Sequence, residues 1–102
     1  MAGATVYVGV LLITIDTPGV GSLKGKRALL LPVVERLKAR FPVSVARLDG
    51  LDSHDWERIG VSAISHDRAW LERTLAGALA FVEGRGLRVR GSSVDIEAWD
   101  AD

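Results

Sequence analysis

Apolar and polar positions follow two different spacings along this 102-residue chain, and the two spacings predict four strands and two helices. Residues 5–16 are a long run of β-branched and aliphatic side chains, which is typical of a strand. Residues 43–49, 56–65 and 87–99 alternate between apolar and polar side chains and predict three more strands. Within the last of these the apolar positions change parity, so we expect a β-bulge near Gly91.

The first helix is predicted by a stripe of apolar residues at helical spacing, namely Leu30, Val34, Leu37 and Phe41. It follows a turn rich in Pro and Gly, and Ser22 at the end of that turn is placed to cap it. Pro32 interrupts the pattern and must either kink the helix or lie in its first turn. The helix is therefore expected to begin between Leu23 and Leu31, and Pro42 ends it.

The second helix has the core stripe Leu71, Leu75, Ala78 and Val82. Asp67 or Ser65 is placed to cap its start, and Gly84 and Gly86 stop it. The predicted order is therefore βαββαβ. With right-handed crossovers this order gives an α+β, ferredoxin-like sandwich: a four-stranded antiparallel sheet with two helices on one face and the first and third strands at its centre. We expect residues 1–102 to form one such domain, which is long enough to bury a core.

The first strand is apolar on both of its faces. One face has Val6, Val8, Val10 and Leu12, and the other has Tyr7, Leu11, Ile13 and Ile15. Two helices on one side of a sheet leave its other face open, and an open face that meets water normally alternates to polar residues. We therefore expect a homodimer whose interface includes Tyr7, Leu11 and Ile13. The alternative is that a loop or the C-terminal segment with Trp99 folds over this face.

Charge is balanced overall but unevenly distributed. Lys and Arg together number 13, as do Asp and Glu, which argues against a bulk polyanion binder. Residues 24–40 nevertheless contain a single acid, Glu35, and six bases: Lys24, Lys26, Arg27, Arg36, Lys38 and Arg40. Acidic residues gather instead in residues 49–57 and 95–102.

The segment GVGSLKGKR, residues 19–27, stands where a phosphate-binding loop would, between a strand and a helix. It is not a P-loop, because the Gly spacing is one residue short and Arg27 replaces Ser or Thr. Backbone N–H groups at a helix start with Lys24 and Lys26 nearby still suit an anion. The plainer interpretation is a helix start with solvated lysines.

The stretch TVYVGVL, residues 5–11, approaches the first-strand signature of an RNA-recognition motif. That module stacks bases on two or three aromatic residues, some of them in its third strand. Here the third strand begins with Trp56 but continues as ERIGVSAIS, with no aromatic residue inside the strand. Tyr7 is therefore interpreted as an interface or sheet-face residue rather than a base platform.

Composition excludes several kinds of chemistry. The absence of Cys excludes disulfides, thiolate metal sites and cysteine nucleophiles. The chain also lacks Asn and Gln, which fits a thermophilic source or biased codon usage equally well. An acylphosphatase-like hydrolase is an alternative that shares the topology, but it needs a third-strand Asn and this chain has none. With no convincing nucleophile–base or acid–base pair, we expect neither an enzyme nor a cofactor.

Two further features bear on metal and membrane binding. Asp49, Asp52, His54 and Asp55 could bind a divalent metal, but their spacing matches neither an EF-hand nor an HExxH motif, so we assign no metal site to them. The apolar run from Val6 to Ile15 is too short to span a bilayer, and no basic segment precedes it. We expect a cytoplasmic protein that does not bind membranes.

With its elements assigned, the chain resembles the YlxP-like family of small bacterial proteins of unknown function. The matching features cover residues 7–97 and are YVGVLLITI, SLKGKR, FPVSVARLD, DSHDWERIGVSAIS and SHDRAWLERTL. The resemblance implies a ferredoxin-like fold and no established activity. The genes of the family often lie among those for translation initiation and ribosome maturation, which implies association with RNA or a ribosomal subunit.

Two hypotheses about function follow. In the first, the protein is a non-enzymatic binding module that contacts RNA or a ribosomal subunit through Ser22, Lys24, Lys26, Arg27, Arg36, Lys38 and Arg40. In the second, it is a homodimeric structural or small-ligand-binding module that uses the open face of the sheet.

Overall fold

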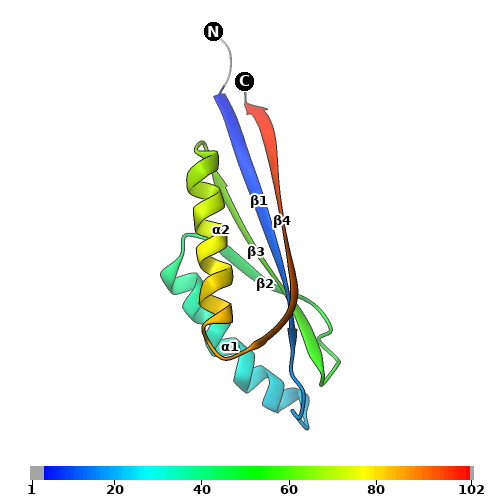
Figure 1. The fold of residues 1–102 in the computed structure, drawn as a ribbon. Helices are drawn as coiled ribbons and strands as arrows, with labels where there is room; N and C mark the ends of the chain where they lie inside the picture. Colours follow the sequence, from blue (N-terminus) through cyan, green and yellow to red (C-terminus); the bar gives the residue numbers. More distant parts are fainter. Residues whose placement is uncertain (1–3, 102) are drawn as a thin grey trace.

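The computed structural model describes residues 4–101, which form a four-stranded antiparallel sheet and two helices (Figure 1). In chain order the elements are β1 (Ala4–Asp16), α1 (Leu23–Arg40), β2 (Ser44–Asp49), β3 (Trp56–Ser65), α2 (Arg68–Glu83) and β4 (Arg88–Ala101). The strands lie in the order β2-β3-β1-β4, with β1 and β3 at the centre. This is the predicted ferredoxin-like α+β fold.

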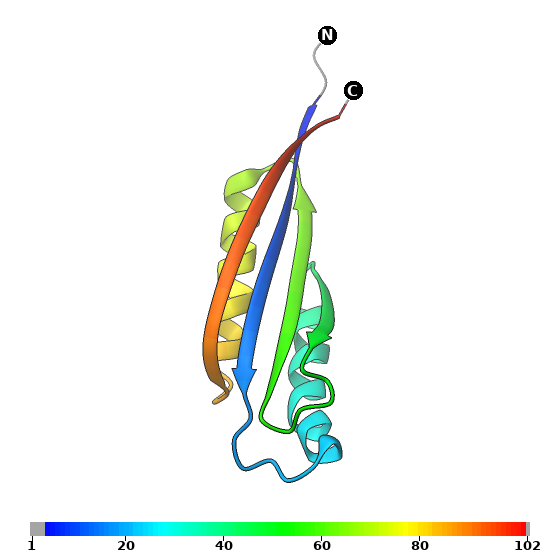
Figure 2. The ribbon, with the colours of Figure 1, turned by 90° about the vertical axis from the view of Figure 1, so that its right-hand side faces the viewer.

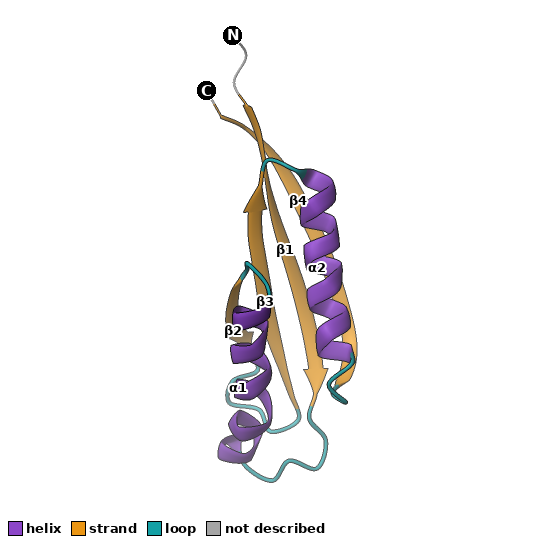
Figure 3. Cartoon of the chain, turned by 90° about the vertical axis from the view of Figure 1, so that its left-hand side faces the viewer, coloured by secondary structure: helices purple, strands orange, loops and turns teal. Residues whose placement is uncertain are grey.

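Both helices lie on the same side of the sheet, as the view from that side shows (Figure 3). The opposite view shows the sheet in front and the helices behind it (Figure 2). The molecule is elongated, with extents of 58 × 22 × 20 Å, because β1 and β4 are long and pair along their whole length. One face of the sheet is therefore covered, and within residues 4–101 no element covers the other.

Helix α1 begins at the earliest of the expected positions. Ser22 is its N-cap, and the Ser22 hydroxyl accepts a hydrogen bond of 2.9 Å from the Gly25 N–H. Pro32 lies inside the helix rather than in its first turn. The helix nevertheless continues to Arg40 because Leu30, Val33, Val34 and Leu37 are buried against the sheet.

Helix α2 agrees with the sequence prediction in its cap and its core stripe. The Asp67 carboxylate accepts a hydrogen bond of 3.1 Å from the Trp70 N–H, and Leu71, Leu75, Ala78 and Val82 are fully buried. The helix approaches β1 closely at Gly9, where a Cβ atom would lie 2.6 Å from Cδ1 of Leu75. Gly9 thus permits the close packing of α2 on the centre of the sheet.

The helices cover the face of β1 that was expected from the sequence to be open. Leu11, Ile13 and Ile15 are fully buried beneath the helices, because Leu11 pairs with Val61 and Ile13 with Ile59 on the covered face. The expectation that Leu11 and Ile13 form an exposed interface is therefore wrong. Tyr7 lies on the same covered side, half-buried, with the Arg68 guanidinium 5.8 Å from its ring centre.

The expected bulge in the last strand is confirmed. Thr14 of β1 pairs with Gly91 of β4, and the next residue, Ile15, pairs with Val89, so Arg90 is the extra residue. The bulge explains why the apolar positions of β4 change parity there. Trp99 does not fold over the open face as a separate segment, because it lies within β4, opposite Val6, and is 58% exposed.

In the part of the chain that the structure describes, neither helix is both long enough and apolar enough to cross a membrane. The cytoplasmic location expected from the sequence stays a prediction.

Candidate functional site

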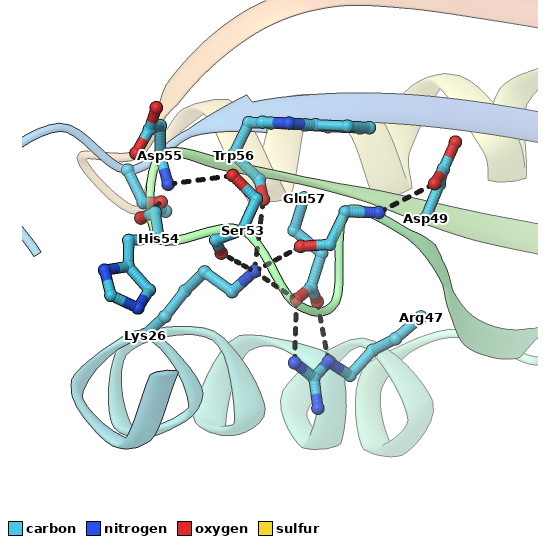
Figure 4. A network of polar contacts seen from close by, with 10 residues as sticks. Lys26, Arg47, Asp49, Ser53, His54, Asp55, Trp56 and Glu57 are labelled. Carbon is cyan, nitrogen blue, oxygen red and sulfur yellow. Dashed lines mark hydrogen bonds and ion pairs between the residues drawn. The ribbon is translucent and has the colours of Figure 1, made fainter. Parts of the chain in front are cut away.

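Lys26 is fully buried, although the sequence placed it among the residues that contact RNA (Figure 4). Its ammonium group donates hydrogen bonds to the backbone carbonyls of Gly50, Ser53 and Trp56, at 2.7, 2.5 and 3.1 Å. It also forms an ion pair of 3.2 Å with the carboxylate of Glu57. The donors of the lysine are fully used inside the protein, so the assignment of Lys26 to an RNA or anion contact is wrong.

Glu57 is buried on the covered face of β3 and is bound from two sides. The Arg47 guanidinium of β2 donates two hydrogen bonds to the Glu57 carboxylate in a bidentate arrangement, with nitrogen–oxygen distances of 2.6 and 2.7 Å. Burial alone would raise the pKa of Glu57, but the hydrogen bonds from Arg47 and Lys26 outweigh burial and hold the pKa below its usual value. The hydrogen bond to Glu57 in turn raises the pKa of Arg47, against the smaller effect of burial. The carboxylate therefore stays ionised in the folded protein.

The acidic segment after β2 folds as a hydrogen-bonded loop. The Asp49 carboxylate accepts a hydrogen bond of 2.8 Å from the Gly50 N–H and lies 3.8 Å from the Arg58 guanidinium. The Ser53 hydroxyl accepts a hydrogen bond of 3.3 Å from the Asp55 N–H. Among residues 4–101 no three carboxylate or imidazole groups converge as metal ligands would. The backbone of this loop, rather than its carboxylates, is what Lys26 binds.

The other basic residues of α1 are exposed, but they do not form a single patch. At about 3.6 residues per turn, Lys24, Arg27 and Lys38 fall on one flank of the helix and Arg36 and Arg40 on the other. The only acidic residue of the helix, Glu35, lies 3.7 Å from the ammonium group of Lys38. Ser22 is exposed, and its hydroxyl is used in capping the helix.

The second flank of α1 faces α2 across a shallow cleft. Arg36 and Arg40 line this cleft together with Ala39, Phe81 and Arg85, and its volume is about 290 Å³. We refer to these five residues as the Phe81 cleft. Phe81 and Arg85 were not among the predicted site residues. Arg36 and Arg40 are four residues apart and so lie on the same side of α1, whereas Arg85 lies beyond the end of α2 and reaches the cleft only in the folded protein.

The open face of the sheet has an apolar centre. Val10, Leu48 and Ile64 are 39, 51 and 66% exposed, although each is a large aliphatic side chain. A groove of about 260 Å³ lies on this face, and its walls include Val10, Leu48 and Gly60. On the β4 side the face becomes acidic, since Asp95 is paired with Val10 in the sheet and Glu97 with Val8.

At the opposite end of this face, Trp56 lies near two arginines. The guanidinium groups of Arg58 and Arg90 lie 5.9 and 5.7 Å from its ring centre. Each also contacts a carboxylate: Arg58 contacts Asp49 at 3.8 Å and Arg90 contacts Asp16 at 2.6 Å. These arginines are locally neutralised and are poor candidates for an anion site.

Taken together, the fold and these surfaces define a small ferredoxin-like protein with a basic helix on one side and an apolar sheet face on the other. The chain belongs to the family described as "Protein of unknown function (DUF503)", whose sequence model matches residues 8–96. It is 35% identical over 63 residues to the uncharacterized protein YlxP of Bacillus subtilis (strain 168), covering 62% of this chain and 68% of that protein. The resemblance noted in the sequence is thereby confirmed.

Solved structures of similar arrangement have little sequence in common with this chain. The de novo designed protein Foldit4 has a TM-score of 0.48 and 15% identity, covering 96% of this chain and 99% of that chain. A dimeric ferredoxin-like protein of unknown function from Thermobifida fusca has a TM-score of 0.45 and 14% identity, covering 90% and 92%. A mutant of SnoaB, a cofactor-independent oxygenase from Streptomyces nogalater, has a TM-score of 0.41 and 19% identity, covering 94% and 92%. At these scores the likenesses say nothing further about function.

Proposed function

We propose that this protein is a non-enzymatic module that binds RNA through its phosphates, using the exposed basic residues of α1. The observation that supports this most directly is the charge of the helix surface. Its exposed basic residues are Lys24, Arg27, Arg36, Lys38 and Arg40, and its one acid, Glu35, is paired with Lys38. The surface is thus strongly basic on a molecule of zero net charge.

A local excess of cations is what phosphate binding requires. Each Lys or Arg that contacts a phosphate releases condensed counterions, which supplies most of the sequence-independent affinity. Acidic residues lie along β4, at Asp95, Glu97 and Asp100, so they would orient the helix, rather than that strand, toward a polyanion. The proposal includes no chemical step. In residues 4–101 no Ser or Thr hydroxyl is hydrogen-bonded to a histidine ring or a carboxylate.

The partner that we propose is ribosomal RNA, an expectation taken from the family resemblance. Co-sedimentation of the purified protein with isolated ribosomal subunits, compared in low and high salt, would test this part separately from the binding itself.

The binding is tested with a fluorescently labelled single-stranded RNA of 12 nucleotides, by anisotropy, over a series of salt concentrations. We expect the logarithm of the affinity to fall linearly with the logarithm of salt, with a slope of about −0.7 for each phosphate contact. The double variant Arg27→Glu, Arg40→Glu, one residue from each flank of α1, should lose at least tenfold in affinity.

The matched control is Arg73→Glu, Arg88→Glu, which reverses two exposed arginines outside α1. It should lose less than threefold, and thermal unfolding should show that both variants keep the stability of the unmodified protein. Binding without a salt dependence, no binding at 50 mM salt, or an equal loss in the control would each contradict the proposal.

The open face of the sheet favours a second, compatible role, namely pairing with another copy of this chain. An apolar centre with an acidic edge resembles the arrangement of protein interfaces, in which a desolvated core lies inside a polar rim. Val10, Leu48 and Ile64 would form that core, with Asp95 and Glu97 at its rim. The groove over Gly60 would then be enclosed at the seam and could admit a small ligand.

A further inference from the structure

The Phe81 cleft lies where the C-terminal ends of the two helices come together. Arg36 and Arg40 approach from α1, Phe81 from the last turn of α2, and Arg85 from just beyond the end of that helix. Its volume of about 290 Å³ is at the lower end of the range for small-ligand sites. The cleft is large enough to hold a phosphate group or one sugar–phosphate unit.

The aromatic ring positions two of the guanidinium groups. The Arg40 and Arg85 guanidinium carbons lie 5.3 and 5.5 Å from the centre of the Phe81 ring. The ring itself is held edge-on by Phe41, at 6.0 Å between ring centres and an interplanar angle of 71°. A guanidinium that rests on an aromatic ring keeps its N–H groups free at its edge, in the forked arrangement that matches a phosphate.

Within residues 4–101, the three arginines of the cleft differ from four other arginines in having no carboxylate partner. Arg27, Arg73 and Arg88 also form no ion pair within that range, but they do not line the cleft. Arg47, Arg58, Arg68 and Arg90 each lie within 4.0 Å of a carboxylate oxygen. For the described part of the chain, no such ion pair forms at Arg36, Arg40 or Arg85. The nearest acid along α1, Glu35, is paired with Lys38 on the other flank. Three positive charges thus converge on a concave surface without an internal counterion.

Helix ends offer a simpler explanation, since cations near a C-terminus interact favourably with the helix dipole. That effect accounts for one cation at the end of each helix. It does not account for the third arginine, one turn before the end of α1, or for the convergence of all three on one cleft. A bound anion explains both.

We propose that the Phe81 cleft is a phosphate-binding site, in which Arg36, Arg40 and Arg85 hold one phosphate group. The proposal rests on the proposed function in naming the source, a backbone phosphate of single-stranded RNA. Arg85 lies outside α1 and is not one of the basic residues of that helix, so a substitution of Arg85 tests the cleft separately from the helix surface. The same three guanidinium groups would also bind a free phosphate, and the two sources are distinguished by two arms of one experiment.

The first arm titrates inorganic phosphate into uniformly labelled protein, with chloride at equal ionic strength as the reference, and follows backbone amide and arginine side-chain resonances by NMR. We expect saturable shifts confined to Phe81, Arg85 and the last turn of α1. Arg85→Gln should weaken this binding at least fivefold. The control Arg73→Gln, which removes an exposed arginine of α2 outside the cleft, should change it less than twofold.

The second arm measures the affinity for the 12-nucleotide RNA. Arg85→Gln should weaken it at least fivefold and reduce the salt slope by no more than about 0.7, the contribution of one phosphate, because Arg36 and Arg40 still face that phosphate. If RNA binds but Arg85→Gln behaves like Arg73→Gln in both arms, the proposed phosphate site in the cleft is contradicted and the proposed function stands. If RNA does not bind while phosphate shifts are saturable and confined to the cleft, the proposed function fails and a free phosphate is the ligand. If phosphate instead shifts resonances evenly over the whole protein surface, the cleft is not a phosphate-binding site.

Discussion

A buried lysine is costly unless its ammonium group is fully hydrogen-bonded, and Lys26 meets that condition with three carbonyls and one carboxylate. The contacts join the first turns of α1 to the loop between β2 and β3, two segments distant in sequence (Figure 4). Lys26 was predictable as a buried residue, because it lies four positions before Leu30 and so on the apolar stripe of α1. Glu57 likewise lies two positions before Ile59, on the buried face of β3.

The variant Lys26→Met tests how much this contact stabilises the protein. Methionine fills the space but removes the donor of three backbone carbonyls and one of the two cations that face Glu57. Breaking a buried ion pair by removing one partner costs about 3–5 kcal/mol. We expect a loss of that size in the free energy of unfolding in urea. The exposed Lys24→Met is the control and should change it by about 0.5 kcal/mol or less. Equal effects of the two variants would show that the network does not stabilise the fold.

The dependence of stability on pH follows from Glu57. Because its pKa is lower in the folded than in the unfolded protein, its contribution is fully present above the unfolded value of about 4.3 and is lost as the pH falls through the folded value. The stability difference between the unmodified protein and Glu57→Gln should therefore be constant from pH 7 to about pH 5 and shrink below about pH 4. Urea unfolding of both proteins across this range measures it. A difference that already shrinks near pH 6 would mean that the pKa of Glu57 is raised.

At the level of elements, local signals were sufficient for the helices, the strands and their order. The caps at Ser22 and Asp67 and the bulge beside Gly91 each follow from the chemistry of a few adjacent residues. The assignment of the faces of β1 failed because both are apolar, and only pairing with β3 decides which one is covered. Gly9, which shares its parity with Leu11, was the available signal, since a helix packs closely where a strand has no side chain.

The candidate site was predictable from the sequence only in part, because it depends on where each residue lies around its helix. Residues 24–40 gave the correct sign of charge, but a count of basic residues ignores their angular position on the helix. Helical spacing separates Arg36 and Arg40 from Arg27 and places Lys26 in the core. Arg85 joins the first pair through the packing of α2 against α1, which is a tertiary relationship.

At the scale of the whole molecule, the two candidate surfaces lie on opposite sides of one sheet (Figures 2 and 3). If two copies pair through their open faces, the substitution Ile64→Lys should make the protein monomeric, because it places a charge in the desolvated centre of the interface. Sedimentation velocity over a range of concentrations measures this. The control Leu29→Lys changes a side chain of α1 that is 42% exposed and should leave the dimer intact. An unmodified protein that stays monomeric at high concentration would contradict pairing.

The same geometry predicts that pairing and RNA binding are independent for a short RNA. In a dimer joined by its sheets, the two helix layers face outward on opposite sides, so one short strand cannot reach both basic surfaces at once, and linking the sites adds no avidity. We therefore expect Ile64→Lys to bind an 8-nucleotide RNA within twofold of the unmodified affinity per chain, with one RNA bound per chain in both proteins. If the monomeric variant instead loses RNA binding while remaining folded, the RNA site spans the seam between the two copies, and the basic surface of α1 is not sufficient for binding.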